Sequence, residues 1–384
     1  MSVLKSGDFL LPKDGFDKWA VVACDQYTSS PEYWENVKAK VGDAPSALNL
    51  ICPEVYLSSI DERKEGIKQA SEAYVKILSA VCGMIFVRRT IEAGERDGLV
   101  CLVDLEAYSY ERRDTLVRAT EGTVIERIPP RLKVRKSSRL DLSHVICLID
   151  DEKKSVVEKA EKGEKLYDVD LGKGGRLEGW LVANTAEIEK ALDAMEAEAV
   201  ANKRPFVLVG DGNHSLASAK ALYEELKNAG DERAERARYA IVEVENLRSN
   251  AIVFEPIHRA LFNANGFAEY LENKAMEKGA SVEQTSSGLV VKAYSEIEVY
   301  RITQSIIDEY LASNKGASVD YIHGEDELLR LKANGAITVK MPSISKAEFF
   351  DYVAKNGNLP RKTFSMGEAY EKRYYMEARD IGRS

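Results

Sequence analysis

The sequence predicts an α/β or α+β fold of mixed sheets with flanking helices, and three observations lead to that prediction. Runs rich in apolar and β-branched residues alternate along most of the chain with segments of helical spacing, which is typical of mixed architectures. The 384 residues are 45% hydrophobic and 30% charged, as in a globular protein. An apolar run at 205–210 passes through a glycine turn directly into an amphipathic segment near His214, which predicts a strand, a tight turn and a helix.

Apolar runs and helical spacing set the order of the elements. The runs 84–91 and 99–108 predict strands, and the polar AGERDG between them predicts a hairpin connection. Residues 118–138 are basic and contain Pro129 and Pro130, so we expect irregular structure there. In full, we expect strands at 19–24, 84–91, 99–108, 144–150, 179–184, 205–210, 238–246, 319–324 and 336–341, and helices at 58–80, 151–166, 187–202, 214–228, 325–334 and 344–356.

The length of the chain predicts two or three domains, at roughly 100–200 residues per domain. We expect an N-terminal α/β region at 1–155, a central region at 156–285 that holds the glycine turn, and a C-terminal α/β region at 286–384. The charged segment 151–166 would then be a hinge. The regions are also compatible with one intertwined sheet.

Charge and composition exclude several classes of protein. A net charge of −9 disfavours a protein that mainly grips nucleic acid, because that affinity comes largely from neutralising phosphates. No stretch approaches the roughly 20 apolar residues of a membrane helix. The five cysteines are scattered without a CxxC pair, so we expect reduced thiols in the cytoplasm, with neither a zinc site nor haem. A homo-oligomer stays open.

The segment PFVLVGDGNHSLASAKALYEEL (205–226) is the most informative in the chain. Its turn consists of Gly210, Asp211, Gly212, Asn213, His214 and Ser215. Glycines allow a ligand to approach the backbone, and the free amides at a helix start attract a phosphate or carboxylate. Asp211 is suited to hold Mg²⁺ or to accept a hydroxyl proton. The alternative is that Asn213 or Ser215 merely caps the helix.

This strand, turn and helix resemble the ADGHHRYE-type signature of the domain-of-unknown-function family ten-fifteen. Further blocks match that family in the same order, so the resemblance covers most of the chain. They are CDQYTS (24–29), NLICPE (49–54), IFVRRT with GLVCLVDLEAY, TEGT (120–123) followed by Arg131, EPIHRALF (255–262) and PRKTF (360–364). The turn is also similar to one in the ParB and sulfiredoxin superfamily, which includes free-serine kinases. The resemblance therefore implies a loop–helix element in the core that handles a nucleotide or a phosphorylated ligand.

The sequence departs from the family signature at functionally important positions. The first histidine of the motif becomes Asn213, its arginine becomes Ser215, and the histidine of a second block becomes Thr120. A serine cannot replace the bidentate phosphate clamp of an arginine. The chain therefore either acts on another substrate or has its clamp supplied from elsewhere, with candidates Arg131, Arg259, Arg361 and Lys362.

Other residues join the candidate site through their neighbours or through the resemblance. Glu121 lies among cationic residues that would keep it ionised, Asp25 ends an expected buried strand, and His258 follows an apolar run. The candidate site comprises Asp211, His214 and Glu121 as catalytic residues, Gly210, Gly212, Asn213, Ser215, Thr123, Arg131, His258, Arg259 and Lys362 as phosphate- or nucleotide-binding residues, Asp25 as a substrate contact, and Asp211 with Glu121 as ligands of Mg²⁺.

Two hypotheses about function follow. In the first, the protein transfers phosphate from ATP or ADP, with Mg²⁺, to a small hydroxylated metabolite such as free serine. In the second, it binds a nucleotide or an acidic metabolite at the same loop without catalysis. The loss of the arginine and of two histidines favours the second.

Overall fold

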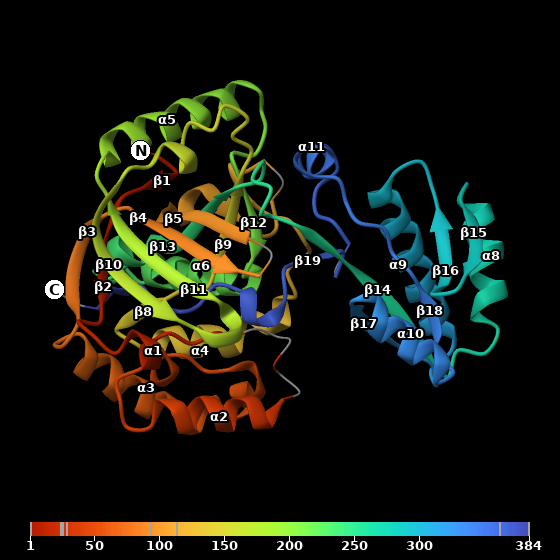
Figure 1. Ribbon diagram of the computed structural model, residues 1–384, viewed down its shortest axis with the longest axis horizontal. Helices are drawn as coiled ribbons and strands as arrows, with labels where there is room; N and C mark the ends of the chain where they lie inside the picture. Colours follow the sequence, from red (N-terminus) through yellow and green to blue (C-terminus); the bar gives the residue numbers. More distant parts are fainter. Residues whose placement is uncertain are drawn as a thin grey trace. The chain divides into compact units, whose positions relative to one another are not determined.

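Two units make up the fold in the computed structural model, which describes residues 2–23, 27, 30–92, 94–112, 114–360 and 362–382 (Figure 1). Unit 1 consists of Met1–Ile252 and Glu368–Ser384, and unit 2 is Val253–Gly367. The C-terminal segment therefore returns to the unit that contains the N-terminus. The three-region division at residues 155 and 285 stays a prediction.

A mixed sheet forms the centre of unit 1, in the order β10-β11-β4-β5-β13-β9-β12-β7-β6, with β1 paired to β5. Its middle combines antiparallel pairs, such as β4 with β5, with the parallel pairs β13–β9 and β12–β7. The strands are β1 Leu4–Lys5, β4 Ile85–Ile91, β5 Gly94–Asp104, β6 Tyr108–Ser109, β7 Val117–Ala119, β9 Ile146–Ile149, β10 Lys162–Asp170, β11 Arg176–Val182, β12 Val207–Asp211 and β13 Tyr239–Asn246.

Each face of this sheet carries its own hydrophobic core, because successive side chains of a strand point to opposite faces. On β5, Leu99 and Cys101 pack into one core, and Val100 and Leu102 pack into the other. The first core contains side chains of α5 and α6, and the second contains Trp19 of α1. In Figure 1, α5 lies above the strands of unit 1, whereas α1, α2 and α3 lie below them.

The helices of unit 1 and a smaller sheet, β3-β2-β20-β8, complete this arrangement. The helices are α1 Phe16–Trp19, α2 Pro31–Val41, α3 Ile60–Tyr74, α4 Ile128–Ser137, α5 Thr185–Ala201, α6 Asn213–Asn228 and α7 Ala234–Ala237. The strands of the smaller sheet are β2 Gly7–Leu11, β3 Ser79–Gly83, β8 Leu140–Leu142 and β20 Ala378–Asp380.

Unit 2 is a second α/β unit built on the sheet β15-β16-β18-β14-β17, with β19 paired to the start of β14. Its strands are β14 Phe254–Phe262, β15 Ser281–Thr285, β16 Gly288–Lys292, β17 Ser318–His323, β18 Ile337–Val339 and β19 Phe364–Met366. Its helices are α8 Phe267–Glu277, α9 Glu296–Ser313, α10 Glu325–Ala333 and α11 Lys346–Asn356.

The structure confirms the predicted fold class of mixed sheets with helices, but it corrects three local predictions. The expected strand at 19–24 begins as the end of α1, and Val21 forms only an isolated bridge with Tyr375. Residues 118–138 contain the helix α4, because proline is tolerated in the first helical turn. The expected helix at 151–166 is instead a short 3₁₀ turn and the start of β10.

Glycines flank α6 at both ends. Both have left-handed backbones but only one is crowded, so comparing them separates the cost of backbone strain from the cost of a steric clash. Both Gly212 (φ +83°) and Gly230 (φ +65°) are left-handed, but a Cβ on Gly212 would lie 3.0 Å from Val145 Cα, whereas one on Gly230 would meet nothing within 4 Å. Alanine at either position adds backbone strain, and at Gly212 it also displaces the backbone at Val145.

We therefore expect Gly212→Ala to lower the free energy of unfolding by about 2–3 kcal/mol, and Gly230→Ala to lower it by only about 1 kcal/mol. Urea denaturation of the two variants and the wild type measures the difference. Equal losses would contradict the packing role of Gly212.

Candidate functional site

Two segments with chemically active side chains meet because β7 and β12 are parallel neighbours. Their register pairs Val207 with Val117 and Val209 with Ala119, so both strands end at the same edge of the sheet. The hydroxyl of Thr120 donates to the carbonyl of Val209 at 2.7 Å and joins the two strand ends. The segments 120–124 and 210–214, which the sequence analysis assigned to one site, therefore lie side by side.

The turn after β12 leaves the start of α6 without a side-chain cap. The N-cap residue is Gly212, with φ 83° and ψ 24°, and no side chain of the described residues caps the helix. The alternative that Asn213 or Ser215 caps the helix is wrong, because both residues lie inside its first turn. The first amides of α6 and its positive dipole end therefore lie at the end of β12, an arrangement that is able to stabilise an anion.

His214 holds the two segments together. Its Nε2 atom accepts a hydrogen bond from the backbone N–H of Val124 at 3.1 Å. An accepting nitrogen carries no proton, so this contact requires the neutral imidazole tautomer with its proton on Nδ1. The contact favours a positioning role for His214 over proton transfer at Nε2.

Asp211 lies beside groups that the sequence analysis did not place in the site. It is opposite Ile146 in the register of β9, and its Oδ2 atom lies 3.9 Å from Nζ of Lys372. His144, which precedes β9, contacts the hydroxyl of Tyr375 through Nδ1 at 2.5 Å. Burial lowers the pKa of His144 to about 4, with nearby arginines adding to the decrease and Asp211 opposing it. His144 is therefore neutral at pH 7.

Two arginines of α4 border the site, and both are held by protein acceptors. Arg131 pairs with Glu54 at 3.0 Å and donates to the carbonyl of Arg127 at 2.9 Å. Arg135 donates to the hydroxyl and carbonyl oxygens of Ser215, both at 3.2 Å, and also contacts Ser218 and Asp141. Arg135 thus supplies a guanidinium next to Ser215, which replaces the arginine of the family signature.

Buried charged side chains lie on β5 and β13 and pair there with each other and with the C-terminal segment. Arg96 lies 3.1 Å from Glu245, and Arg373 lies 3.1 Å from Glu243. Burial is the main cause that raises the pKa of Glu245 to about 7; Arg96 opposes the increase and Glu243 adds to it. Charges this deeply buried persist because they are paired.

The remaining candidates lie in unit 2 or outside the described residues. His258 and Arg259 are both on β14; His258 Nδ1 accepts from the N–H of Met341 at 3.0 Å, and Arg259 donates to Gln304 at 3.0 Å. Burial lowers the pKa of His258 to about 4. Lys362 also belongs to unit 2. Asp25 and Arg361 fall outside the described residues.

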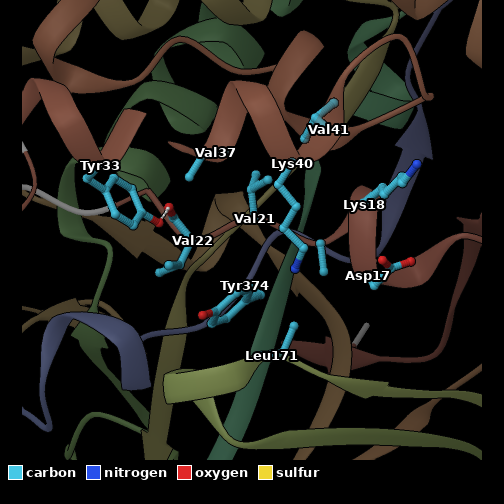
Figure 2. A pocket seen from close by; sticks show the side chains of 11 residues that line it. Asp17, Lys18, Val21, Val22, Tyr33, Val37, Lys40, Val41, Leu171 and Tyr374 are labelled. Carbon is cyan, nitrogen blue, oxygen red and sulfur yellow. Dashed lines mark hydrogen bonds between the residues drawn. The ribbon is translucent and has the colours of Figure 1, made fainter. Parts of the chain in front are cut away.

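A small cavity of about 160 Å³ lies in unit 1 between α1, α2 and Tyr374 (Figure 2). Its lining is mostly aliphatic, from residues such as Val21, Val37 and Leu171, and the hydroxyl of Tyr33 donates to the carbonyl of Val22 at 2.9 Å. Ligand pockets usually enclose about 300–1,000 Å³, so this cavity is too small for a nucleotide.

The described part of the chain contains neither a cluster of three potential metal ligands nor a helix suited to cross a membrane. No group of three or more His, Cys, Asp or Glu side chains is arranged there to hold a metal ion. None of the helices that the structure describes combines the length and apolar character required to cross a bilayer.

The family described as "Protein of unknown function (DUF1015)" matches residues 9–372. The chain belongs to this family. The resemblance found in the ordered sequence blocks is thereby confirmed. No curated protein matches the sequence.

Several solved structures resemble the chain at low scores. A mutant free serine kinase in complex with AMP is 9% identical over 72% of this chain and 90% of its own, with a TM-score of 0.41. Free serine kinase in complex with AMP is 11% identical over 72% and 90%, with a TM-score of 0.39. A conserved hypothetical protein from Pyrococcus furiosus is 10% identical over 72% and 94%, with a TM-score of 0.36. Scores at this level do not establish a common function.

His144 makes the stability of the protein depend on pH. Its pKa is lowered in the folded state, so the unfolded chain binds the proton more tightly and stability is lost as the pH falls from about 6.5 toward 4. Between pH 7 and pH 5 the expected contribution is about 2 kcal/mol. Over this interval we expect the free energy of unfolding of His144→Gln to fall by about 2 kcal/mol less than that of the wild type. Urea denaturation at both pH values measures the difference. An identical loss in the two proteins would contradict the shifted titration.

Proposed function

We propose that the chain transfers a phosphoryl group from a nucleotide to a small hydroxylated metabolite, at a site around the start of α6. The observation that carries the proposal is the uncapped helix start beside the carboxylate of Asp211 and the ammonium group of Lys372. A helix start attracts the phosphates, and a neighbouring carboxylate accepts the proton of the attacking hydroxyl. Phosphoryl transfer needs little more from a protein than positioning and charge neutralisation.

Each residue of the site has a role in this proposal. The amides near Gly212 and Asn213 hold phosphate oxygens, with Gly210, Ser215 and Thr123 around them. Asp211 accepts the hydroxyl proton, and Glu121 is the second candidate for that role. His214 positions the 120–124 segment through Val124. Arg131 adds positive charge at the border of the site.

Mg²⁺ fits this set of residues. The ion is usually bound by one or two protein carboxylates together with substrate phosphates, rather than by a full protein cage. Asp211 and Glu121 would supply those carboxylates, since they belong to the adjoining segments at the ends of β12 and β7. When bound, Mg²⁺ would neutralise negative charge on the phosphates.

The acceptor is a small hydroxylated metabolite in this reaction. A free amino acid such as serine is the acceptor that the sequence resemblance suggests. AMP and ADP are the nucleotides bound in the structures of free serine kinase. The phosphate-binding roles of His258, Arg259 and Lys362, and the substrate contact of Asp25, stay predictions.

A binding protein without catalysis is the second candidate function. Two observations favour it: His214 Nε2 already accepts a hydrogen bond from Val124, and Arg135 is engaged by Ser215, Ser218 and Asp141. A sensor would need only the anion-binding helix start. In that case His214→Ala would abolish nucleotide binding, and no acceptor would support turnover.

Asp211→Asn tests the proposed reaction. Purified protein is incubated with ATP or ADP, Mg²⁺ and a panel of amino acids and sugars, and nucleotide affinity is measured by calorimetry. We expect the variant to bind nucleotide in the absence of Mg²⁺ within about threefold of the wild type, but to turn over about 10²–10⁴-fold more slowly, as for loss of a general base. The matched control is Asp193→Asn on the exposed surface of α5, which should behave as the wild type does.

The outcomes separate the two candidate functions. If the wild-type protein binds nucleotide but no acceptor supports turnover, the binding protein without catalysis is favoured. Neither binding nor turnover by the wild-type protein would overturn both.

A further inference from the structure

The cavity beside Tyr374 has a buried apolar interior. Ala20, Val21, Val22 and Val41 line it, and all four side chains are buried. Its volume of about 160 Å³ is close to that of an engineered apolar cavity of about 150 Å³ that binds benzene. The interior therefore matches an apolar group of about five or six carbon atoms.

Hydrogen bonds hold the wall that follows α1 in place. Trp19 Nε1 donates to the carbonyl of Met376 at 2.7 Å, and the N–H of Tyr375 donates to the carbonyl of Val21 at 2.8 Å. These contacts tie the wall to the C-terminal segment of unit 1. A cavity with walls held in this way is largely formed before a ligand arrives, which lowers the entropic cost of binding.

Tyr374 adds an aromatic wall, and its position is also constrained. The guanidinium carbon of Arg89 lies 4.9 Å from the centroid of the Tyr374 ring, and Arg89 is only 2% exposed, so this cation–π contact is shielded from water. Leu171, whose N–H donates to the carbonyl of Gly175 at 2.8 Å, supplies a further aliphatic wall. Aliphatic and aromatic walls together favour a ligand with an apolar body.

Charged side chains lie at the mouth of the cavity. Asp17, Lys18 and Lys40 belong to its lining and are exposed, so two ammonium groups stand against one carboxylate. In Figure 2 the side chain of Lys40 extends from α2 in among the other lining residues, whereas the nitrogen of Lys18 points away from them. Lys40 is therefore the cation placed to meet the polar end of a molecule whose apolar end fills the interior.

We propose that this cavity binds a small monocarboxylate with a branched or aromatic body of about five or six carbon atoms. The body fills the interior, and the carboxylate lies at the mouth against the ammonium group of Lys40. One carboxylate suits this mouth better than a phosphate dianion, because the excess positive charge of the lining is a single unit and Asp17 repels further negative charge. The lining residues lie outside the start of α6, so the inference does not depend on the proposed reaction.

An NMR titration of the full chain with 4-methylpentanoate and its neutral amide tests this proposal. Chemical-shift changes of the backbone amides of Val37 and Val41, which line the cavity, report binding there. We expect the acid to saturate these changes in the millimolar range and the amide to bind about fivefold more weakly, as for loss of one solvent-exposed ion pair. Acetate lacks the branched body and should not saturate them, since each buried CH₂ contributes about fourfold in affinity.

Two variants separate the contribution of the carboxylate from that of the apolar body. Lys40→Gln should lower the affinity for the acid about fivefold and leave the affinity for the amide unchanged. Val37→Phe fills the interior, so neither molecule should bind. The matched control is Lys38→Gln, because Lys38 lies on the same helix but donates to the hydroxyl of Tyr56 at 3.1 Å, away from the lining. This variant should bind both molecules as the wild type does.

Each outcome supports or overturns the proposal. Absence of saturable shift changes with the acid, or equal affinity of the wild type for the acid and the amide, would overturn it. A folded Val37→Phe protein that still binds the acid would place the ligand elsewhere and would also overturn it. If Val37→Phe fails to fold, Lys40→Gln decides: a loss of affinity confined to the acid supports the proposal, and an unchanged affinity for the acid contradicts it.

Discussion

The parallel pairing of β7 with β12 is the constraint on which the candidate site depends. Parallel neighbours end at the same edge of a sheet, so the register of Val207 with Val117 brings residues 120–124 next to the turn at Gly212. The hydroxyl of Thr120 and the imidazole of His214 then join the two segments by one hydrogen bond each. The family signature has a histidine at position 120, and threonine retains a polar contact between the strands. The substitution therefore changes the chemistry of the position while the two segments stay together.

The buried charges beside this edge explain how the C-terminal segment comes to belong to the same unit. Glu243 and Glu245 point to the face of β13 that the segment covers, where they would be unpaired without Arg96 and Arg373. Burying an isolated carboxylate costs folding free energy. Docking of Arg373 compensates this cost for Glu243 of β13. Such a network adds little net stability compared with an apolar core, but it specifies one position for the segment. That specificity matters most for the residue next to Arg373, which is Lys372.

Sequence reasoning located the turn but missed the groups that surround it. The elements at β12 and α6 carry strong local signals, namely an apolar run, glycines and an amphipathic period, and these were predicted almost to the residue. Arg135 was missed because Pro129 and Pro130 suggested irregular structure. A helix beginning at those prolines would have placed Arg131 and Arg135 one turn apart on the same face. Lys372 and His144 were missed for a different reason: nothing local links them to Asp211, and only the folded sheet brings them near it.

The replacement of the family arginine by Ser215 is therefore a rearrangement of positive charge rather than its loss. The guanidinium of Arg135 lies against Ser215, but its donors are directed at Ser215, Ser218 and Asp141, so it holds the first turn of α6 in place. An arginine at position 215 itself would bring a second guanidinium toward Arg135, and like charges in a half-buried site repel each other. Serine at 215 and arginine at 135 are thus mutually consistent. Among the described residues no side chain caps the start of α6, and a lysine beside the carboxylate of Asp211 comes from the other end of the chain.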